Sequence, residues 1–550
     1  MYFAGSFSFM KTLIAYFAGL IACTTTCFSQ TVTFTSSNLP VIIINTNGQT
    51  IVDDPKITAD MGVIFNAGNA RNNVTDSFNQ YNGKIGIEIR GQSSQTFPMK
   101  SYGLELRDNS GNSQNKSLFG LPKESDWILY APYTDKTLMR NFLAYTMSQQ
   151  MGHWAAHCRF VELVLNGEYQ GIYVFMEKIK WGSGRVNVTK MAVTDTSSDA
   201  VTGGYIFSLD KQANAWFSAY PYPNAPGRAQ FSYVYPKPEN IVLQQQAYIK
   251  SYVDSFENAL YGPQFQDPIN GVRKFADIPS FIDYFIVNEV SRNVDGYRLS
   301  SYFTKDRNSI NAKIIAGPVW DYDLAFRNNS YCNGSDTTGW AYNFNTVCPT
   351  DYWFVPFWWN NFMKDTAFVG NLRCRWKSLR NTSLSETHFN ALIDSVASLL
   401  NEASQRHFQQ WPVLGQAIWP NPDPIPTTYA GEISTLKAWI SARLQWIDEN
   451  LPNTGACSDY AAGRNEAFNI LLNPNPLNGS GTMIIQSGVN QRAGVRIMDA
   501  MGRTMLLQSV SLQPGSNNFQ LNTSAWAAGV YFILVESSSG DKLVKKLLHD

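Results

Sequence analysis

The sequence predicts an α+β protein with a β-rich first half, a mostly helical second half and a small β-sandwich at its C-terminus. Apolar and polar residues alternate around Ile85, Ile87 and Ile89, which is the period of a β-strand. Over residues 356–449 the apolar residues follow a helical period instead. Beyond residue 466, short alternating segments return between Asn/Gly turns, as is typical of an antiparallel sandwich.

Composition excludes some partners and leaves others open. The 43 Lys and Arg residues balance the 43 Asp and Glu residues, so no net charge draws the chain to nucleic acid or to an anionic membrane. Aromatic residues make up 14% of the chain, and 15 residues are Trp. Such a composition suits a secreted enzyme and a sugar-contacting surface equally.

Residues 1–29 have the pattern of a signal peptide. Lys11 precedes an apolar run over residues 12–23 that is too short to span a bilayer, and small or polar residues follow. We expect export with cleavage near Ser29, and a retained membrane anchor is the alternative. No later stretch of the sequence is apolar enough for a transmembrane anchor.

The β-rich half is expected to begin with an N-terminal β extension over residues 30–84. Two strands follow, over residues 85–90 and 102–106. The segment between them starts with Arg90-Gly91-Gln92-Ser93-Ser94, whose amides and hydroxyls could meet phosphate oxygens; a plain turn is the alternative. Lys100 enters the second strand, where it could reach nucleotide phosphates or lie at the surface.

A helix and a hairpin continue this half. Residues 135–151 have helical spacing, and Asp135 can cap the start. Arg140 lies inside this helix and could pair with an acidic group or remain solvated. Residues 160–176 form the clearest hairpin, with a tight turn at Asn166-Gly167, and end at Glu177.

Another β segment is expected to begin at residues 203–206, and from about residue 241 the chain is expected to be mostly helical, apart from two short strands near 301–304 and 313–316, up to a linker over residues 451–465. The sandwich then occupies residues 466–550. The predicted helices cover residues 241–260, a stretch starting near 277, and residues 356–364, 369–378, 386–402 and 432–449.

The stretch from Asn288 to Asn328 carries the densest candidate chemistry. A loop presents Asp295, two short strands follow, and Asp321 and Asp323 lie on the next turn. This order can bring carboxylates from two loops to one mouth of a cleft. One carboxylate could then accept a proton while another holds a divalent cation, as phosphoryl transfer requires.

Other catalytic motifs are missing from the sequence. The five His residues form no HExxH or other metal-binding pair, and there is no GxSxG segment or Walker loop. Paired carboxylates could also hydrolyse glycosides, and a single Asp could be only a turn residue. Cys332 and Cys348 lie in one polar loop and could form a disulfide in an oxidising compartment or remain free thiols.

Five segments occur in order over residues 85–330: RGQSSQTFPMKSYGLEL, DWILYAPYTDKTLMRNFLAY, VELVLNGEYQGIYVFMEKI, NVDGYRLSSYFTKD and GPVWDYDLAF. In these segments the chain resembles the CotH-type kinases, the spore-coat-protein-H family of atypical secreted protein kinases. The resemblance implies a degenerate protein-kinase-like fold over residues 85–450, with a β-rich N-lobe and a helical C-lobe.

The resemblance also implies roles for single residues. Asp295 would be the catalytic base that accepts the proton of a substrate hydroxyl. Ser300 stands where a kinase-like catalytic loop carries a metal-holding Asn. The residues implied to hold Mg²⁺ or Mn²⁺ are Asp321, Asp323 and Ser300, and those implied to contact ATP are Lys100, Arg90, Ser93 and Glu177.

The end of the chain carries a second resemblance. The segments NPNPLNG (473–479), VRIMDAMGR (495–503) and WAAGVYFILV (526–535), with a Lys-bearing last strand, resemble the C-terminal sorting domain of type IX secretion cargo in Bacteroidetes. This resemblance implies recognition by the type IX secretion machinery and a secreted or outer-membrane-surface location. A carbohydrate-binding sandwich is the alternative.

Together these observations lead us to expect a secreted or cell-surface kinase. It would transfer the γ-phosphate of ATP to Ser or Thr of an exported protein, with Mg²⁺ or Mn²⁺ as cofactor. One alternative is a non-catalytic binding or adhesion protein that keeps the fold. The other is a polysaccharide-active enzyme that uses the carboxylates and Trp surfaces.

Overall fold

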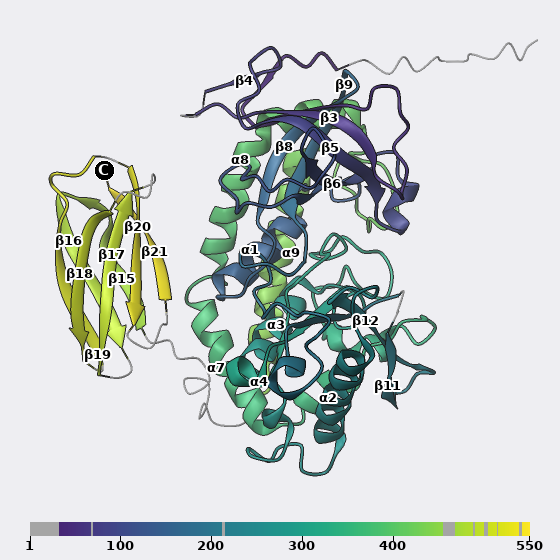
Figure 1. Ribbon diagram of the computed structural model, residues 1–550, viewed down its shortest axis with the longest axis vertical. Helices are drawn as coiled ribbons and strands as arrows, with labels where there is room; N and C mark the ends of the chain where they lie inside the picture. Colours follow the sequence, from purple (N-terminus) through teal and green to yellow (C-terminus); the bar gives the residue numbers. More distant parts are fainter. Residues whose placement is uncertain are drawn as a thin grey trace, which may run out of the picture.

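The computed structural model describes residues 32–67, 70–211, 215–454, 468–487, 490–499, 504–513, 515–527, 529–537 and 542–549. A closed β-barrel, an open sheet with helices, and a C-terminal β-rich unit follow one another along the chain (Figure 1). The predicted α+β class with a β-rich C-terminus is therefore confirmed. The predicted signal peptide lies outside the described residues. Within them, no helix combines the length and apolarity needed to cross a membrane.

Seven strands close into the barrel. Neighbouring strands pair antiparallel, except that Val41 of the first strand lies opposite Glu162 in a parallel pairing that closes the ring. Ile85, Ile87 and Leu104 fill the interior together with other branched side chains. In barrel order the strands are β2 (Val41–Asn45), β3 (Ile57–Ile64), β5 (Tyr81–Arg90), β6 (Ser101–Arg107), β7 (Asp126–Tyr130), β9 (Glu168–Glu177) and β8 (Cys158–Leu165).

The barrel corrects the predicted extension over residues 30–84. Strands β2 and β3 are part of the ring because Ile42, Ile44 and Met61 are buried in its interior. The boundary after residue 84 falls inside β5. Only the short pair β1 (Ser36–Ser37) and β4 (Asn72–Asn73) lies outside the barrel among the described strands of this segment.

The predicted hairpin is confirmed as β8 and β9, and its turn residues Asn166 and Gly167 both have positive φ, as a tight two-residue turn requires. The predicted helix before this hairpin differs at its start: α1 spans Arg140–Gln150 rather than beginning at Asp135. Leu138 has a φ of 65°, which interrupts the helix. The carboxylate of Asp135 instead accepts the backbone N–H of Arg140 at 2.8 Å.

An open five-stranded sheet follows the barrel. All its pairings are antiparallel, and the strand order places β10 beside β13, with Leu209 opposite Ser301. Residues 210 and 300, one step beyond that pair, therefore lie next to each other at the end of the sheet. In sheet order the strands are β11 (Trp216–Pro221), β12 (Arg228–Tyr235), β10 (Tyr205–Leu209), β13 (Ser301–Lys305) and β14 (Ile314–Ala316).

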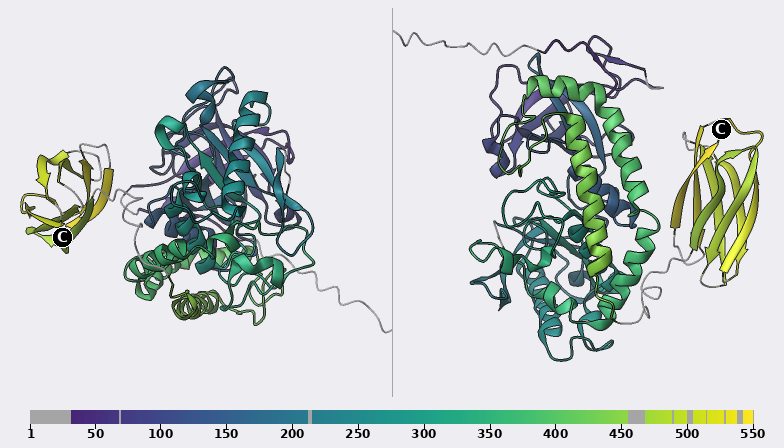
Figure 2. Two further views of the ribbon diagram at one scale, coloured as in Figure 1. Left: turned by 90° about the horizontal axis from the view of Figure 1, so that it is seen from below. Right: turned by 180° about the vertical axis from the view of Figure 1, so that it is seen from behind.

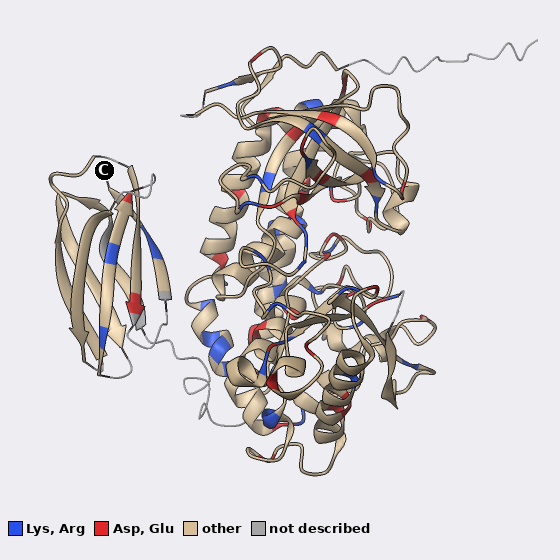
Figure 3. Ribbon diagram, in the orientation of Figure 1, with Lys and Arg blue, Asp and Glu red and all other residues tan. Residues whose placement is uncertain are grey.

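Helices build the rest of this half. Every residue of α3 (Ile278–Ser291) except Pro279 is buried. Trp358 and Trp359 are fully buried in the same core. The two longest helices, α8 and α9, run along the back of both the barrel and the helical half (Figure 2). The helices are α2 (Leu243–Tyr261), α3 (Ile278–Ser291), α4 (Asn308–Asn311), α5 (Phe344–Val347), α6 (Trp358–Phe362), α7 (Thr366–Arg380), α8 (Glu386–Gln410) and α9 (Tyr429–Asn450). Charges of both signs are interspersed over these elements (Figure 3).

The C-terminal unit is a seven-stranded sheet folded around its own apolar core. Alternation in the sequence predicts strands over residues 482–486, 494–498, 505–507, 518–521, 530–536 and 542–548, which correspond to six of these strands, whereas β15, which contains the segment NPNPLNG, was not predicted. In sheet order the strands are β18 (Thr504–Leu512), β17 (Gln491–Asp499), β20 (Gly529–Ser537), β21 (Lys542–His549), β15 (Phe468–Asn478), β16 (Ser480–Ser487) and β19 (Gly515–Asn522).

Candidate functional site

A cavity of about 370 Å³ lies where the barrel meets the helical half. Residues from both parts line it, so it depends on their packing. The predicted site residues on its walls are Arg90, Ser93, Asp295, Ser300, Asp321 and Asp323, and Asp210 joins them. The structure thus brings together carboxylates that are distant in sequence and the small polar segment that follows β5.

A buried arginine fixes the orientation of Asp295. The loop after α3 presents this residue, and Nη2 of Arg298 donates to Asp295 Oδ1 at 2.9 Å. The Arg298 guanidinium also donates to the carbonyl of Trp353 at 2.8 Å and lies 3.9 Å from the ring centroid of Phe344. Because Arg298 is held by these contacts, the carboxylate of Asp295 is held on the cavity wall as well.

Asp321 lies on the loop after β14 and is tied to both sides of the site. Its backbone N–H donates to the hydroxyl of Tyr145 on α1 at 3.2 Å. Its carbonyl accepts the side-chain amide of Asn293, from the Asp295 loop, also at 3.2 Å. The hydroxyl of Ser300 donates to the Asp321 carboxylate at 3.4 Å. These bonds connect the two acidic loops directly.

Burial of the carboxyl groups, together with their mutual crowding, raises their affinity for protons. Burial, followed by the charges of Asp295 and Asp210, raises the pKa of Asp321 to about 6. Burial and the charge of Asp321 raise the pKa of Asp323 well above its usual range, and its carboxyl group donates a hydrogen bond to Asp321. Burial also raises the pKa of Asp210. The cavity is therefore a region in which added positive charge is favourable.

One arginine supplies part of that positive charge. Arg90 is the last residue of β5, and its guanidinium lies 6.0 Å from the ring centroid of Trp320. Burial lowers the pKa of Arg90, and the nearby Tyr302 and Asp321 oppose this effect. Arg90 thus faces the acidic loops from the barrel side.

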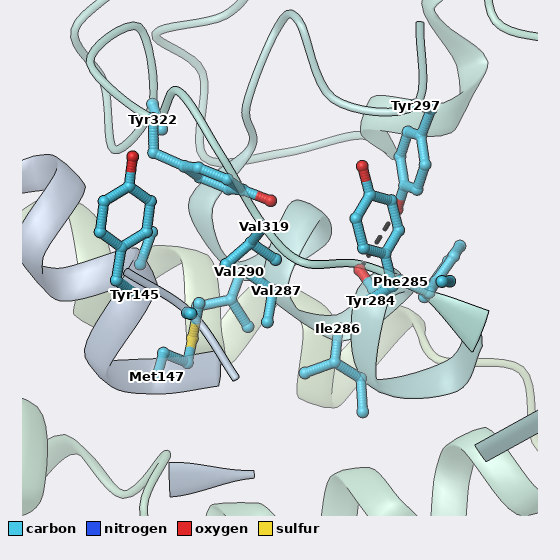
Figure 4. Close-up of a cluster of buried hydrophobic side chains, with 14 of the residues drawn as sticks. Tyr145, Met147, Tyr284, Phe285, Ile286, Val287, Val290, Tyr297, Val319 and Tyr322 are labelled. Atoms are coloured by element: carbon cyan, nitrogen blue, oxygen red, sulfur yellow. Dashed lines mark hydrogen bonds between the residues drawn. The ribbon is translucent and has the colours of Figure 1, made fainter. Parts of the chain in front are cut away.

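Backbone strain is concentrated in the acidic loops. Tyr297, Ser300 and Asp321 have φ values of 72°, 46° and 66°, a region that non-glycine residues rarely occupy. The Tyr297 hydroxyl contributes to holding its loop, because it donates to the carbonyl of Phe285 at 3.2 Å and to the buried carboxylate of Glu289 at 3.0 Å. Figure 4 shows the apolar side chains of α3 beneath Tyr297, with Tyr145 and Tyr322 beside them.

Two predicted nucleotide contacts lie elsewhere. Lys100 precedes β6 and does not line the cavity; its ammonium group donates to the carbonyls of Gln95 and Phe97, each at 2.6 Å. Glu177 is fully buried at the end of β9, where it accepts the backbone N–H of His157 at 3.0 Å and contacts its ring nitrogen at 2.7 Å. Neither side chain is available to the cavity in this arrangement.

Among the wall residues that were not predicted from the sequence, Asp210, Tyr145 and Asn141 make hydrogen bonds that shape the site. Asp210 accepts the backbone N–H of Lys211 at 2.7 Å, and Tyr145 and Asn141 of α1 bond to the backbone of the Asp321 loop. The signal for Asp210 was present, because an acid directly after a strand lies at a sheet end. Pairing that strand with β13 required a register that alternation alone does not give.

The donor set fits a hard divalent cation in its chemistry. Asp321, Asp323 and Ser300 offer only oxygen atoms, which Mg²⁺ and Mn²⁺ prefer. Because burial and the charge of Asp321 raise the pKa of Asp323, binding of a cation there would be coupled to loss of a proton from Asp323. Among the described residues, the one group of three His, Cys, Asp or Glu side chains whose ligand atoms all lie within 4.8 Å of one another is Cys332, Cys348 and Asp351, which lies outside the acidic cavity. The two cysteines of that group form a disulfide, as the sequence allowed.

The barrel packed on a helical half, with an acidic cavity between them and a C-terminal β-rich unit, defines a multidomain protein with a candidate site at the junction of its first two parts. Comparison with known families makes this specific. Residues 87–447 match the CotH kinase protein family, and the chain belongs to that family. Residues 472–549 match the secretion system C-terminal sorting domain. This domain marks the chain for secretion or for the outer-membrane surface.

Other comparisons add nothing to the argument. No curated protein matches the chain. Two solved structures of a β-glucosidase from Listeria innocua, in complex with isofagomine and with glucose, are 19% identical to it with a TM-score of 0.12. The match covers 15% of this chain and 16% of theirs. Similarity on this scale carries no inference about fold or activity.

Proposed function

We propose that this protein is a secreted or cell-surface kinase with a degenerate protein-kinase-like fold. It transfers the γ-phosphate of ATP to Ser or Thr of an exported protein. The observation that carries the proposal is the meeting of Asp295, Asp321 and Asp323 with Arg90 and Ser93 in one cavity. Family membership and the sorting domain support it.

In this proposal the residues that line the cavity have distinct roles. Asp295, held by Arg298, accepts the proton of the acceptor hydroxyl as its oxygen bonds to the γ-phosphorus and the bond from that phosphorus to the β–γ bridging oxygen breaks, so that ADP leaves. The Arg90 guanidinium and the amides and hydroxyls around Ser93 bind phosphate oxygens. Arg90 takes this task because Lys100 is bonded to two carbonyls outside the cavity.

Asp321 and Asp323 would hold Mg²⁺ or Mn²⁺, with Ser300 as a weaker oxygen ligand. When bound, the cation offsets the negative charge of the phosphates. The remaining contribution of these loops is positional: the bonds from Asn293 and to Tyr145 keep the Asp321 backbone in place beside Asp295.

The test is incubation of the purified protein with γ-labelled ATP, Mn²⁺ and a Ser/Thr-containing acceptor from the exported fraction. Asp295→Asn should reduce label transfer by at least about a thousandfold, the upper part of the general-base range, while nucleotide binding persists. Asp53→Asn, an exposed acid outside the cavity, is the matched control and should transfer label normally. Equal transfer by both variants would refute the assignment of Asp295.

Two observations favour a second function, a non-catalytic binding protein. No lysine from the barrel strands lines the described cavity wall, and Ser300 is a poorer metal ligand than the Asn of a kinase-like loop. In that case ATP and Mn²⁺ bind with no label transfer to any acceptor, and Asp295→Asn leaves binding unchanged.

A further inference from the structure

A second cavity, which shares no residue with the acidic one, lies in the helical half. Its volume is about 440 Å³, within the range of small-molecule sites. Four segments form its walls: the loop after β11 at residues 221–224, the end of α2 at Tyr261, residues 342–346, and α6 with the turn that follows it.

Aromatic rings form rigid parts of this cavity. Tyr261 is 56% exposed, and its ring stands perpendicular to that of Phe357 at a centroid distance of 5.3 Å. Tyr220 packs against Tyr261 with the ring centroids 4.3 Å apart. On the opposite segment, Tyr342 packs against Phe285 at 5.7 Å. Because these rings are positioned before any ligand binds, ligand binding would not incur the entropy cost of immobilising them.

Side-chain amides supply the polar part of the walls. Asn345 is structural, because its amide donates to the carbonyls of Pro223 and Val355 and its oxygen accepts the Val355 N–H. Asn224, Asn343 and Asn360 differ from it. Within the described residues, no hydrogen bond engages the side-chain amides of these three. Each offers a donor and an acceptor to whatever fills the cavity.

The cavity is nearly free of charge. Lys364 is its one charged residue in the described lining, and the Lys364 ammonium donates to Asn361 Oδ1 at 3.2 Å. No carboxylate or imidazole is present there for proton transfer or metal binding. The walls therefore suit a neutral ligand that has hydroxyl groups on its edges and apolar faces.

We propose that this cavity binds a segment of a neutral polysaccharide. Sugar hydroxyls donate and accept hydrogen bonds, and free carboxamides match both capacities. The C–H faces of pyranose rings pack on aromatic faces such as that of Tyr261. Residues 342–346 belong to the loop closed by the Cys332–Cys348 disulfide, so this wall is held in place in an oxidising compartment. The proposal is independent of phosphotransfer at the acidic cavity.

The test is calorimetric titration of the full chain with soluble neutral hexasaccharides of β-1,4-glucose, β-1,4-xylose and α-mannose, and with an uncharged Gly/Ser-rich peptide. At least one saccharide should bind. Tyr261→Ala and Asn360→Ala should each weaken binding by about tenfold, or about 1.4 kcal/mol. Tyr352→Ala removes a tyrosine that is 88% exposed and lies outside both cavities, and it should change nothing.

Two further results bear on the proposal. Asp295→Asn should bind the saccharide as the wild type does, which separates this site from the acidic cavity. Asn360→Ala removes a half-buried amide from α6 and should leave the melting temperature unchanged, so its effect cannot be assigned to unfolding. Absence of binding to all three saccharides, binding that neither cavity variant weakens, or preferential binding of the peptide would each overturn the proposal.

Discussion

Glu289 offers a stringent test of how the site is supported. Its carboxylate, buried on α3, accepts four donors: the Tyr297 hydroxyl at 3.0 Å, the backbone N–H groups of Ala341 and Tyr342 at 2.7 and 3.0 Å, and Nη2 of Arg443 at 3.1 Å. Burial raises the pKa of Glu289, and Arg443 and the two amides oppose that effect. One carboxylate thus connects α3, α9 and the strained loop that carries Asp295.

The perturbation is Glu289→Gln, which keeps the size and removes the charge. An amide NH₂ would then face groups that are themselves donors, and the Arg443 guanidinium would lose its buried counter-ion. Breaking a buried pair in this way costs about 3–5 kcal/mol. At roughly 2 °C per kcal/mol for a domain of this size, the melting temperature should fall by about 6–10 °C.

The assay is scanning calorimetry of the full chain. Glu449→Gln, an exposed acid on α9, is the matched control and should shift the transition by less than about 1 °C. The double variant Glu289→Leu with Arg443→Met should lose less stability than the two single variants added together, because it leaves no charge unpaired. A Glu289→Gln transition within about 2 °C of wild type would refute the claim that this carboxylate supports the site.

Three shorter predictions concern the cavity and its surroundings. Mn²⁺ affinity, followed by electron paramagnetic resonance, should fall by about a further tenfold per pH unit below about pH 6, because Asp321 then binds a proton in addition to the one on Asp323; Asp210→Asn should move this change of slope to lower pH, and a profile with no change of slope near pH 6 would contradict the assignment. Cys332→Ser should cost about 3 kcal/mol of stability, since the disulfide closes a loop of 16 residues to Cys348, and an unchanged denaturation midpoint would count against this. Arg298→Met should lower label transfer at least about tenfold with ATP binding retained, because the catalytic carboxylate loses its fixed partner; normal transfer would show that the pairing is dispensable.

The sequence anticipated the parts of the fold that local patterns determine. The hairpin around Asn166-Gly167 and the helices of the second half follow from turn chemistry, capping and apolar period. It did not anticipate closure of the barrel, because the pairing of β2 with β8 joins residues about 120 positions apart. Contacts of that separation leave no local pattern. The start of α1 was missed for a local reason, the left-handed backbone at Leu138.

The candidate site, like the fold, was predictable from the sequence only in part. Ordered segments were enough to place Asp295 and Asp321 near each other, and the cavity contains both. The order of segments says nothing about side-chain direction, which is why Lys100 was expected at the phosphates although its ammonium group points to two carbonyls of its own turn. Predicting that Asp210 lies at the site would have required the register of β10 against β13, which only the folded sheet provides.

The two long helices have a consequence for how ligands could enter and leave. Two residues near the C-terminal end of α8 contact the barrel. Arg406 pairs with the buried Glu162 at 2.7 Å, and His407 accepts the backbone N–H of Ile172 at 3.1 Å. From there α8 extends with α9 behind the helical half (Figure 2). A wide opening between the barrel and the helical half would require α8 to bend or its contacts with the barrel to break. Exchange at the acidic cavity is therefore expected to proceed through small displacements of the rim, at the turn around Ser93 and at Trp419.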